Sequence, residues 1–201
     1  MVCTVGIFLF DQVEALDFAG PYEVFTTASR VFKRLHPEAA EPFRVITIAE
    51  SSAPVQARAG MRVLPDFDLR SHPQIDLLII PGGVVNQELE KQAVIAWIAA
   101  QSLGADITAS VCTGAFLLAQ AGLLGNGPVT THWEDIDDLR AMFPALDVRE
   151  NQRWVDQGSI VTSAGISAGI DMSLHLVERI VDRQLALRTA RQMEFDWTEA
   201  G

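Results

Sequence analysis

The sequence predicts a single α/β domain in which helices cover both faces of a mostly parallel sheet. Short and nearly continuous apolar runs, such as residues 77–80, alternate with longer helical segments. This pattern is typical of parallel strands that are buried on both faces. The chain has 201 residues, of which 49% are hydrophobic, so it can bury a core without disulfides. No repeat, low-complexity segment or linker divides it, and we expect residues 1–201 to form one domain.

The first half of the chain contains three predicted strands. Residues 4–10 form the first strand, and Gly20-Pro21 then opens a helix towards Leu35, because proline is favoured in a first helical turn. Residues 43–49 form the second strand, and residues 51–64 a small hairpin or an irregular excursion. Residues 76–80 form the third strand, which Pro81-Gly82-Gly83 ends.

The second half continues the alternation. A helix is expected over residues 87–102, and residues 106–111 form a strand that ends at Cys112. A short acidic helix leads up to Phe143-Pro144. Residues 154–162 have the pattern of a hairpin with a turn at residues 156–158, and residues 168–197 are expected to be helical.

Charge and composition exclude several classes of protein. The formal net charge of −11 argues against a nucleic-acid or anionic-membrane partner, because phosphates would be repelled. No apolar run reaches the roughly 18 residues of a membrane span. The apolar residues 2–10 lack the basic start and the cleavage site of a signal peptide, so we expect a cytoplasmic protein. Two cysteines give neither a disulfide framework nor metal-ligand spacing, and no metal or cofactor is expected.

Cys112 is the strongest candidate for chemistry. A β-type run precedes it, and the small residues Thr113-Gly114 then lead into an apolar helix. A strand that turns sharply into a helix places the cysteine at the end of a sheet, near the positive end of the helix dipole. There we expect the thiol to lose its proton easily, as in a nucleophile elbow. The alternative is a small buried apolar residue, which is how we interpret Cys3.

Asp17 is the candidate acid or base. It lies between the first strand and its helix, flanked by Leu16 and Phe18, so its carboxyl is partly desolvated and its pKa should rise. Such a group can transfer protons near neutral pH. The alternative is an N-cap for the helix that Pro21 starts.

Three further residues are candidates for binding. Gly82 and Gly83 follow a buried strand and could present N–H groups as an oxyanion hole, or simply form a tight turn. Thr113 could offer its hydroxyl or N–H to a bound anion, or be an ordinary first-turn residue. His132, by contrast, is interpreted as a hydrogen-bonded structural residue rather than the partner of Cys112. Ligands of open α/β sheets bind beyond the carboxyl ends of the strands, where the loops carrying these residues should converge.

Together these motifs resemble the ThiJ/PfpI superfamily of flavodoxin-like α/β proteins. The resemblance implies a flavodoxin-like three-layer sandwich and spans nearly the whole chain. It is carried by residues 16–21 (LDFAGP), 80–83 (IPGG), 110–114 (SVCTG), 130–133 (TTHW) and 162–171 (TSAGISAGID).

Two branches of the superfamily share these segments. One is the isocyanide hydratases, which are homodimers with aspartate where other branches have glutamate. The other is the sensor half of AraC-type transcription regulators, for whose helix-turn-helix domain this chain, ending at Gly201, has no room. The protease branch has histidine where Thr113 stands, and the glyoxalase-like branch has glutamate where Asp17 stands, so neither activity is expected.

The resemblance therefore implies a cofactor-free hydration of an isocyanide to an N-substituted formamide in a homodimer. Cys112 would attack the isocyanide carbon, and Asp17 would protonate it and then activate water. Gly82, Gly83 and Thr113 would hold the small-molecule substrate. The alternatives are a ligand- or redox-sensing protein in which Cys112 does not turn over, and hydration or hydrolysis of another small electrophile.

Overall fold

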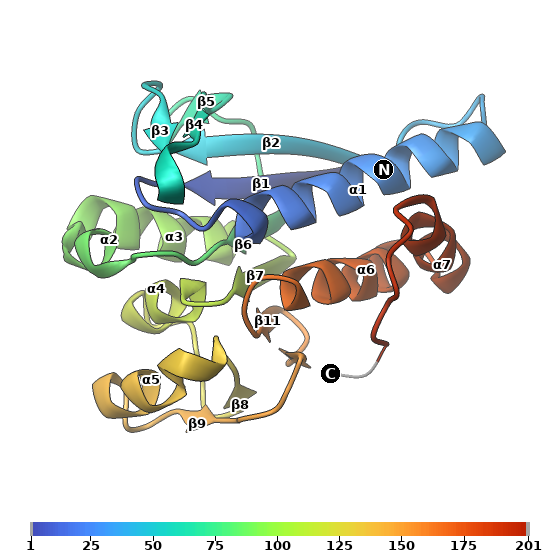
Figure 1. The fold of residues 1–201 in the computed structure, drawn as a ribbon. Helices are drawn as coiled ribbons and strands as arrows, with labels where there is room; N and C mark the ends of the chain where they lie inside the picture. The colour runs from blue at the N-terminus through green and yellow to red at the C-terminus, as the bar shows by residue number, and fades with distance from the viewer. Residues whose placement is uncertain (1, 200–201) are drawn as a thin grey trace.

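The computed structural model describes residues 2–199 and contains a seven-stranded sheet between two helical layers (Figure 1). The strand order is β10-β11-β7-β6-β1-β2-β5, and every neighbouring pair is parallel except β10 with β11. The predicted α/β sandwich with a mostly parallel sheet is therefore confirmed. The strands of this sheet are β1 (Cys3–Leu9), β2 (Phe43–Ala49), β5 (Phe67–Asp68), β6 (Leu77–Ile80), β7 (Ile107–Val111), β10 (Trp154–Asp156) and β11 (Ile160–Ser163).

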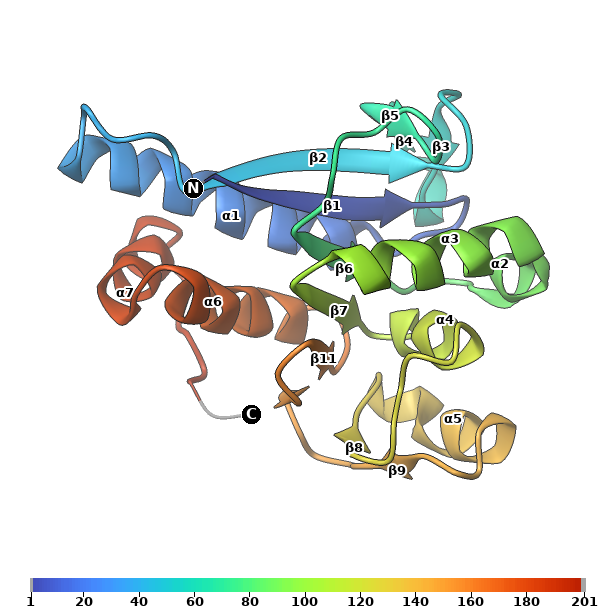
Figure 2. The ribbon, with the colours of Figure 1, turned by 180° about the vertical axis from the view of Figure 1, so that it is seen from behind.

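Helices cover both faces of the sheet (Figures 1 and 2). One layer contains α1 (Ala15–Leu35), α6 (Ala168–Ile180) and α7 (Arg183–Gln192); the other contains α2 (Asn86–Glu90), α3 (Gln92–Gly104) and α4 (Gly114–Gln120). The smaller elements are β3 (Val55–Gln56), η1 (Arg58–Gly60), β4 (Arg62–Val63), β8 (Pro128–Val129), η2 (Trp133–Asp135), α5 (Ile136–Met142) and β9 (Asp147–Val148). Among the described residues, no helix is long and apolar enough to cross a membrane.

The central strands are apolar on both faces because both faces are covered. All four residues of β6 are fully buried, as are Ile7, Phe8 and Leu9 of β1. Strands in this position lose the alternation of polar and apolar residues that a one-sided sheet shows. This is why β1, β2 and β6 are found close to the predicted ranges.

The start of α1 differs from the prediction. The helix begins at Ala15, so Gly20 and Pro21 lie inside it. Proline has no N–H, so Pro21 cannot donate the helical hydrogen bond to the carbonyl of Asp17, four residues earlier. The early start is fixed from outside the helix, since the N–H of its N-cap residue Glu14 donates to the Gly82 carbonyl at 2.8 Å.

Two other helical predictions are also corrected. The helix expected over residues 87–102 is divided into α2 and α3 at Lys91, whose backbone is extended. The long helix expected over residues 168–197 is divided into α6 and α7, because Asp182 leaves the helix and caps α7 through the N–H of Leu185 at 2.7 Å. Both predicted hairpins, β3–β4 and β10–β11, are confirmed.

The loops that follow β1, β6 and β7 meet at one edge of the sheet, as predicted. These three strands are parallel neighbours, so their carboxyl ends lie together. Val13 and Gly83 form an isolated bridge between the first two loops. Cys112 follows β7 directly and faces this junction.

Gly114→Ala should destabilise the fold by about 1–3 kcal/mol, the usual effect of overpacking. A Cβ at Gly114 would overlap the backbone carbonyl of Ile80, which cannot move without shifting β6. Gly104→Ala is the matched control, because a Cβ there meets no atom within 4 Å. Denaturant unfolding of both variants tests this. Equal stability of the two variants would contradict the packing of β6 on the start of α4.

Candidate active site

Cys112 occupies a strained turn between β7 and α4. Its φ of 57° lies in the left-handed region, which costs free energy for a residue with a side chain. Its N–H is shared between the carbonyls of Ser163 at 3.2 Å and Ala164 at 3.3 Å, and its carbonyl accepts the Thr131 hydroxyl at 2.8 Å. These contacts hold the predicted elbow and leave the side chain buried at the end of the sheet.

Thr113 joins this elbow to the loop after β6. Its hydroxyl accepts the N–H of Gly83 and donates to the carbonyl of the same residue, both at 2.9 Å. Its N–H and hydroxyl also lower the pKa of the Cys112 thiol, against the larger rise that burial causes. Gly82 permits this closeness, since a Cβ there would lie 2.5 Å from Thr113 Oγ1 and 2.9 Å from Cys112 Cβ.

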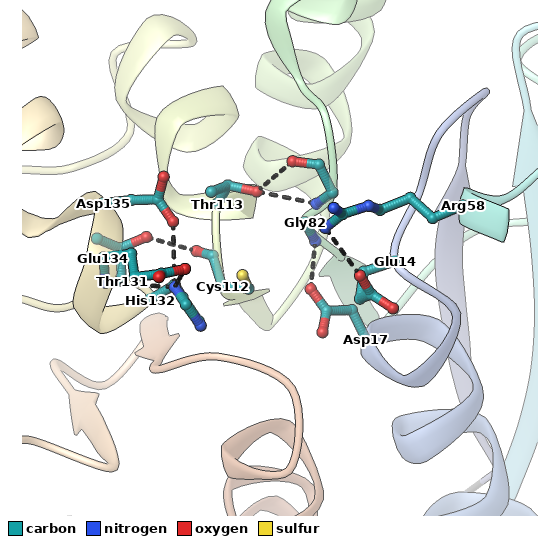
Figure 3. A network of polar contacts seen from close by, with 11 residues as sticks. Glu14, Asp17, Arg58, Gly82, Cys112, Thr113, Thr131, His132, Glu134 and Asp135 are labelled. Carbon is teal, nitrogen blue, oxygen red and sulfur yellow. Dashed lines mark hydrogen bonds and ion pairs between the residues drawn. The ribbon is translucent and has the colours of Figure 1, made fainter.

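Asp17 faces Cys112 from the first turn of α1 (Figure 3). Its side chain is fully buried, and its Oδ2 accepts the N–H of Gly82 at 3.0 Å. The Cys112 thiol lies opposite this carboxyl, and the thiol and the backbone N–H of Ile166 both lower its pKa. The interpretation of Asp17 as an N-cap is wrong, because Glu14 occupies that position.

Burial governs the protonation of both groups. Desolvation raises the pKa of Asp17 to about 7; the Gly82 N–H opposes this rise, and the charge of Glu14 adds to it. Desolvation and then the charge of Asp17 raise the pKa of the Cys112 thiol. The prediction that this thiol loses its proton easily is therefore wrong, because the seven-residue helix α4 does not offset burial. Above about pH 7 the pair consists of a protonated thiol facing a carboxylate.

The two glycines of the loop after β6 already have hydrogen-bond partners. The Gly82 N–H binds Asp17, and the Gly83 N–H binds Thr113. In this structure they position the two side chains that flank Cys112. Their part in holding a substrate oxygen or nitrogen stays a prediction.

His132 has a structural role in the described residues. Its Nδ1 accepts the N–H of Glu134 at 3.3 Å, which caps η2, and lies 3.3 Å from Asp135 Oδ2. A Cβ at Gly165 would overlap the imidazole, so the ring is tightly packed. Figure 3 places His132 and Asp17 on opposite sides of Cys112.

The sequence analysis missed three residues of this site. Ile166 has a φ of 53°, unusual for a β-branched residue, and its backbone N–H lowers the pKa of Asp17. Glu14 stands one helical turn before Asp17, a spacing that could have identified it. Arg58 reaches Glu14 from the β3–β4 hairpin, and no sequence spacing reveals that contact. Among residues 2–199, no cluster of three or more His, Cys, Asp or Glu side chains could hold a metal ion.

Comparison with known proteins identifies the family. The sequence profile of the DJ-1/PfpI family matches residues 3–179. The chain is also 32% identical to an isonitrile hydratase of Pseudomonas putida, across 97% of this chain and 79% of that protein. The chain belongs to the DJ-1/PfpI family. The resemblance to the ThiJ/PfpI superfamily is thereby confirmed.

Other DJ-1/PfpI relatives are regulators. The transcriptional regulator GbdR of Pseudomonas aeruginosa is 28% identical over 91% of this chain, which spans about half the length of that protein. Among solved structures, a ThiJ/PfpI family protein from Pseudomonas syringae superposes with a TM-score of 0.84 at 25% identity, over 98% of this chain and 77% of that one. Drosophila melanogaster DJ-1beta shares the fold, with a TM-score of 0.82 at 17% identity over 98% of this chain and all of its own.

Asp17→Asn should make the protein more stable above pH 7, by on the order of 2–4 kcal/mol. Folding raises the pKa of Asp17 from 3.8 to about 7, so between these values the folded state binds more protons than the unfolded state. Wild-type stability therefore falls as pH rises from about 4 to about 7, whereas the variant lacks this loss. Denaturant unfolding between pH 4 and 8.5 measures the difference, and a gap that is constant with pH would contradict the raised pKa.

Proposed function

We propose that this protein hydrates an isocyanide to an N-substituted formamide without a cofactor. The observation that carries the proposal is the buried carboxyl of Asp17, whose pKa is about 7 and which faces the Cys112 thiol (Figure 3). This pair combines a nucleophile with a group that can both accept and return its proton. The similarity to an isonitrile hydratase supports isocyanide as the electrophile.

The first step joins sulfur to carbon. The terminal carbon of the isocyanide accepts electrons from Cys112 Sγ while Asp17 takes the thiol proton. Asp17 then delivers that proton to the same carbon, and the product is a thioimidate with a C–H bond. Because the thiol stays protonated until attack, Asp17 must act during the step rather than before it.

The second step consumes water. Asp17, again ionised, removes a proton from water as its oxygen attacks the thioimidate carbon, and passes that proton to the nitrogen. Asp17 then takes the hydroxyl proton of the tetrahedral adduct as the carbonyl forms and the C–S bond breaks, and it returns this proton to the departing Cys112 sulfur. The formamide leaves with one added water and the enzyme returns to its starting state. We propose that N–H groups around Gly83 and Thr113 steady the reacting atoms.

The wider setting of this activity is also a proposal. We infer one cytoplasmic domain, active as a homodimer on a small-molecule substrate, with no nucleic-acid or membrane partner. Exposed apolar side chains near the site on α1, Leu16 and Tyr22, support association with a second copy. The net charge of −11 supports the exclusion of polyanionic partners.

A second candidate function is ligand sensing without turnover. The similarity to GbdR, a regulator, favours it. Of the two kinds of sensor, ligand binding is better supported than oxidation, because peroxide reacts with thiolates and burial keeps Cys112 protonated. A sensor would bind one equivalent of ligand and release no product.

The decisive test is steady-state turnover of a simple alkyl or aryl isocyanide, followed by formamide appearance. Cys112→Ala should reduce kcat/KM by at least ~10³-fold, since it removes the nucleophile. Asp17→Asn should reduce it ~10²–10⁴-fold, because the thiol proton then has no acceptor. Cys3→Ser is the matched control and should retain activity, because Cys3 lies at the start of β1, away from the junction.

Two outcomes would contradict the hydratase. Full activity in Cys112→Ala would exclude covalent catalysis by this thiol. No turnover by folded wild-type protein, together with stoichiometric isocyanide binding, would favour the sensor.

In the same assay, kcat/KM of the wild type should rise with pH through about 7 and then level off. The active form needs Asp17 ionised while Cys112 still carries its proton. The pKa of Asp17, about 7, therefore sets the midpoint of the rise in kcat/KM with pH. Stopped assays between pH 5.5 and 9 test this. A rate that falls as pH rises through 7 would show that protonated Asp17 is the active form.

A further inference from the structure

An ion pair lies beside the proposed catalytic pair. Arg58 Nη1 is 3.1 Å from Glu14 Oε2, and Figure 3 shows the two side chains next to Gly82 and Asp17. The Glu14 side chain is 24% exposed, whereas that of Arg58 is 54% exposed. A pair this accessible adds little to stability, so its position suggests another role.

Backbone hydrogen bonds fix both partners relative to Asp17. Glu14 donates its N–H to the Gly82 carbonyl at 2.8 Å and accepts the Asp17 N–H at 3.1 Å. On the other side, the Arg58 N–H donates to the Val13 carbonyl at 3.0 Å. The η1 turn is thus attached to the loop that carries Glu14. This attachment places the Arg58 guanidinium beside the Glu14 carboxylate.

The pair acts on Asp17 through charge. A carboxylate near a buried carboxyl opposes its ionisation, and the charge of Glu14 raises the pKa of Asp17. A guanidinium bound to Glu14 offsets that charge. Loss of Glu14 should therefore lower the pKa of Asp17, and loss of Arg58 should raise it.

We propose that Arg58 is a positioning residue that holds the Glu14 carboxylate and thereby sets the pH at which Asp17 can take the proton of Cys112. This inference rests on the proposed role of Asp17 as the proton acceptor. It assigns to the β3–β4 hairpin a function in tuning the site.

Other charged groups around the site are accounted for. The thiol of Cys112 faces Asp17 from the elbow, and Asp135 of η2 acts on that thiol by its charge. His132 lies against Asp135. On α6, Asp171 is buried against Arg153. None of these groups contacts Glu14 or Arg58, so changes in the pair leave them in place.

The test uses alkylation of Cys112 by iodoacetamide between pH 5 and 9, with the modified peptide quantified by mass spectrometry. This readout needs Asp17 to accept the thiol proton but needs no isocyanide. Burial raises the pKa of Cys3 to about 12, and its separate peptide distinguishes any reaction there. The wild-type midpoint is expected near pH 7.

The two single variants should shift this midpoint in opposite directions. Glu14→Gln removes a negative charge and should lower it, and Arg58→Ala unpairs Glu14 and should raise it, each by at least ~0.5 pH unit. Arg58→Lys should restore most of the wild-type value. If Arg58 acts through Glu14, then Arg58→Ala made in Glu14→Gln protein should change the midpoint much less than it does in wild type.

Glu23→Gln is the matched control, because Glu23, on α1, also pairs with an arginine, Arg30, but in an exposed position. It changes net charge by the same amount and should leave the midpoint unchanged. Unfolding curves verify that each variant is folded.

Unchanged midpoints in both single variants, or shifts in the same direction, would overturn the inference. An unchanged midpoint in Asp17→Asn would also overturn it, since another group would then be titrating. Opposite shifts in alkylation without isocyanide turnover would instead sustain the inference and reject the hydratase.

Discussion

The close approach of Gly82 to two other segments is the constraint on which the site depends. Its N–H binds Asp17, its carbonyl accepts the N–H of Glu14, and its missing side chain lets Thr113 and Cys112 lie against it. One glycine thus connects the loops after β1, β6 and β7. Any side chain at this position would separate the carboxyl from the thiol.

Burial at that junction determines the chemistry. A thiol at a helix start in water would be acidified, but here the Cys112 side chain and Asp17 share a desolvated site, and the negative charge resides on the carboxylate. Such a site contains little thiolate. It is suited to electrophiles that the thiol attacks and the carboxyl protonates in the same step. The strained backbone of Cys112 and Ile166, both at positive φ, holds this arrangement in place.

Membership of the DJ-1/PfpI family is consistent with more than one use of the same geometry. An isonitrile hydratase and DNA-binding regulators both resemble the chain over most of its length. In the proposed mechanism, turnover would differ from sensing by two local properties: the access of water to the adduct, and the proton affinity of Asp17. Glu14 and Arg58 lie where they can influence the second of these.

The sequence by itself determined the parallel sheet and the junction of Asp17, Gly82 and Cys112, because buried strands are continuously apolar and their carboxyl ends must meet. It could not place the start of α1, since Pro21 satisfies the local rule for a first turn and only the contact between Glu14 and Gly82 extends the helix back to Ala15. The direction of the Cys112 pKa and the contact from Arg58 were likewise decided by tertiary structure, because desolvation and long-range charge depend on which segments pack together, and local sequence does not encode that.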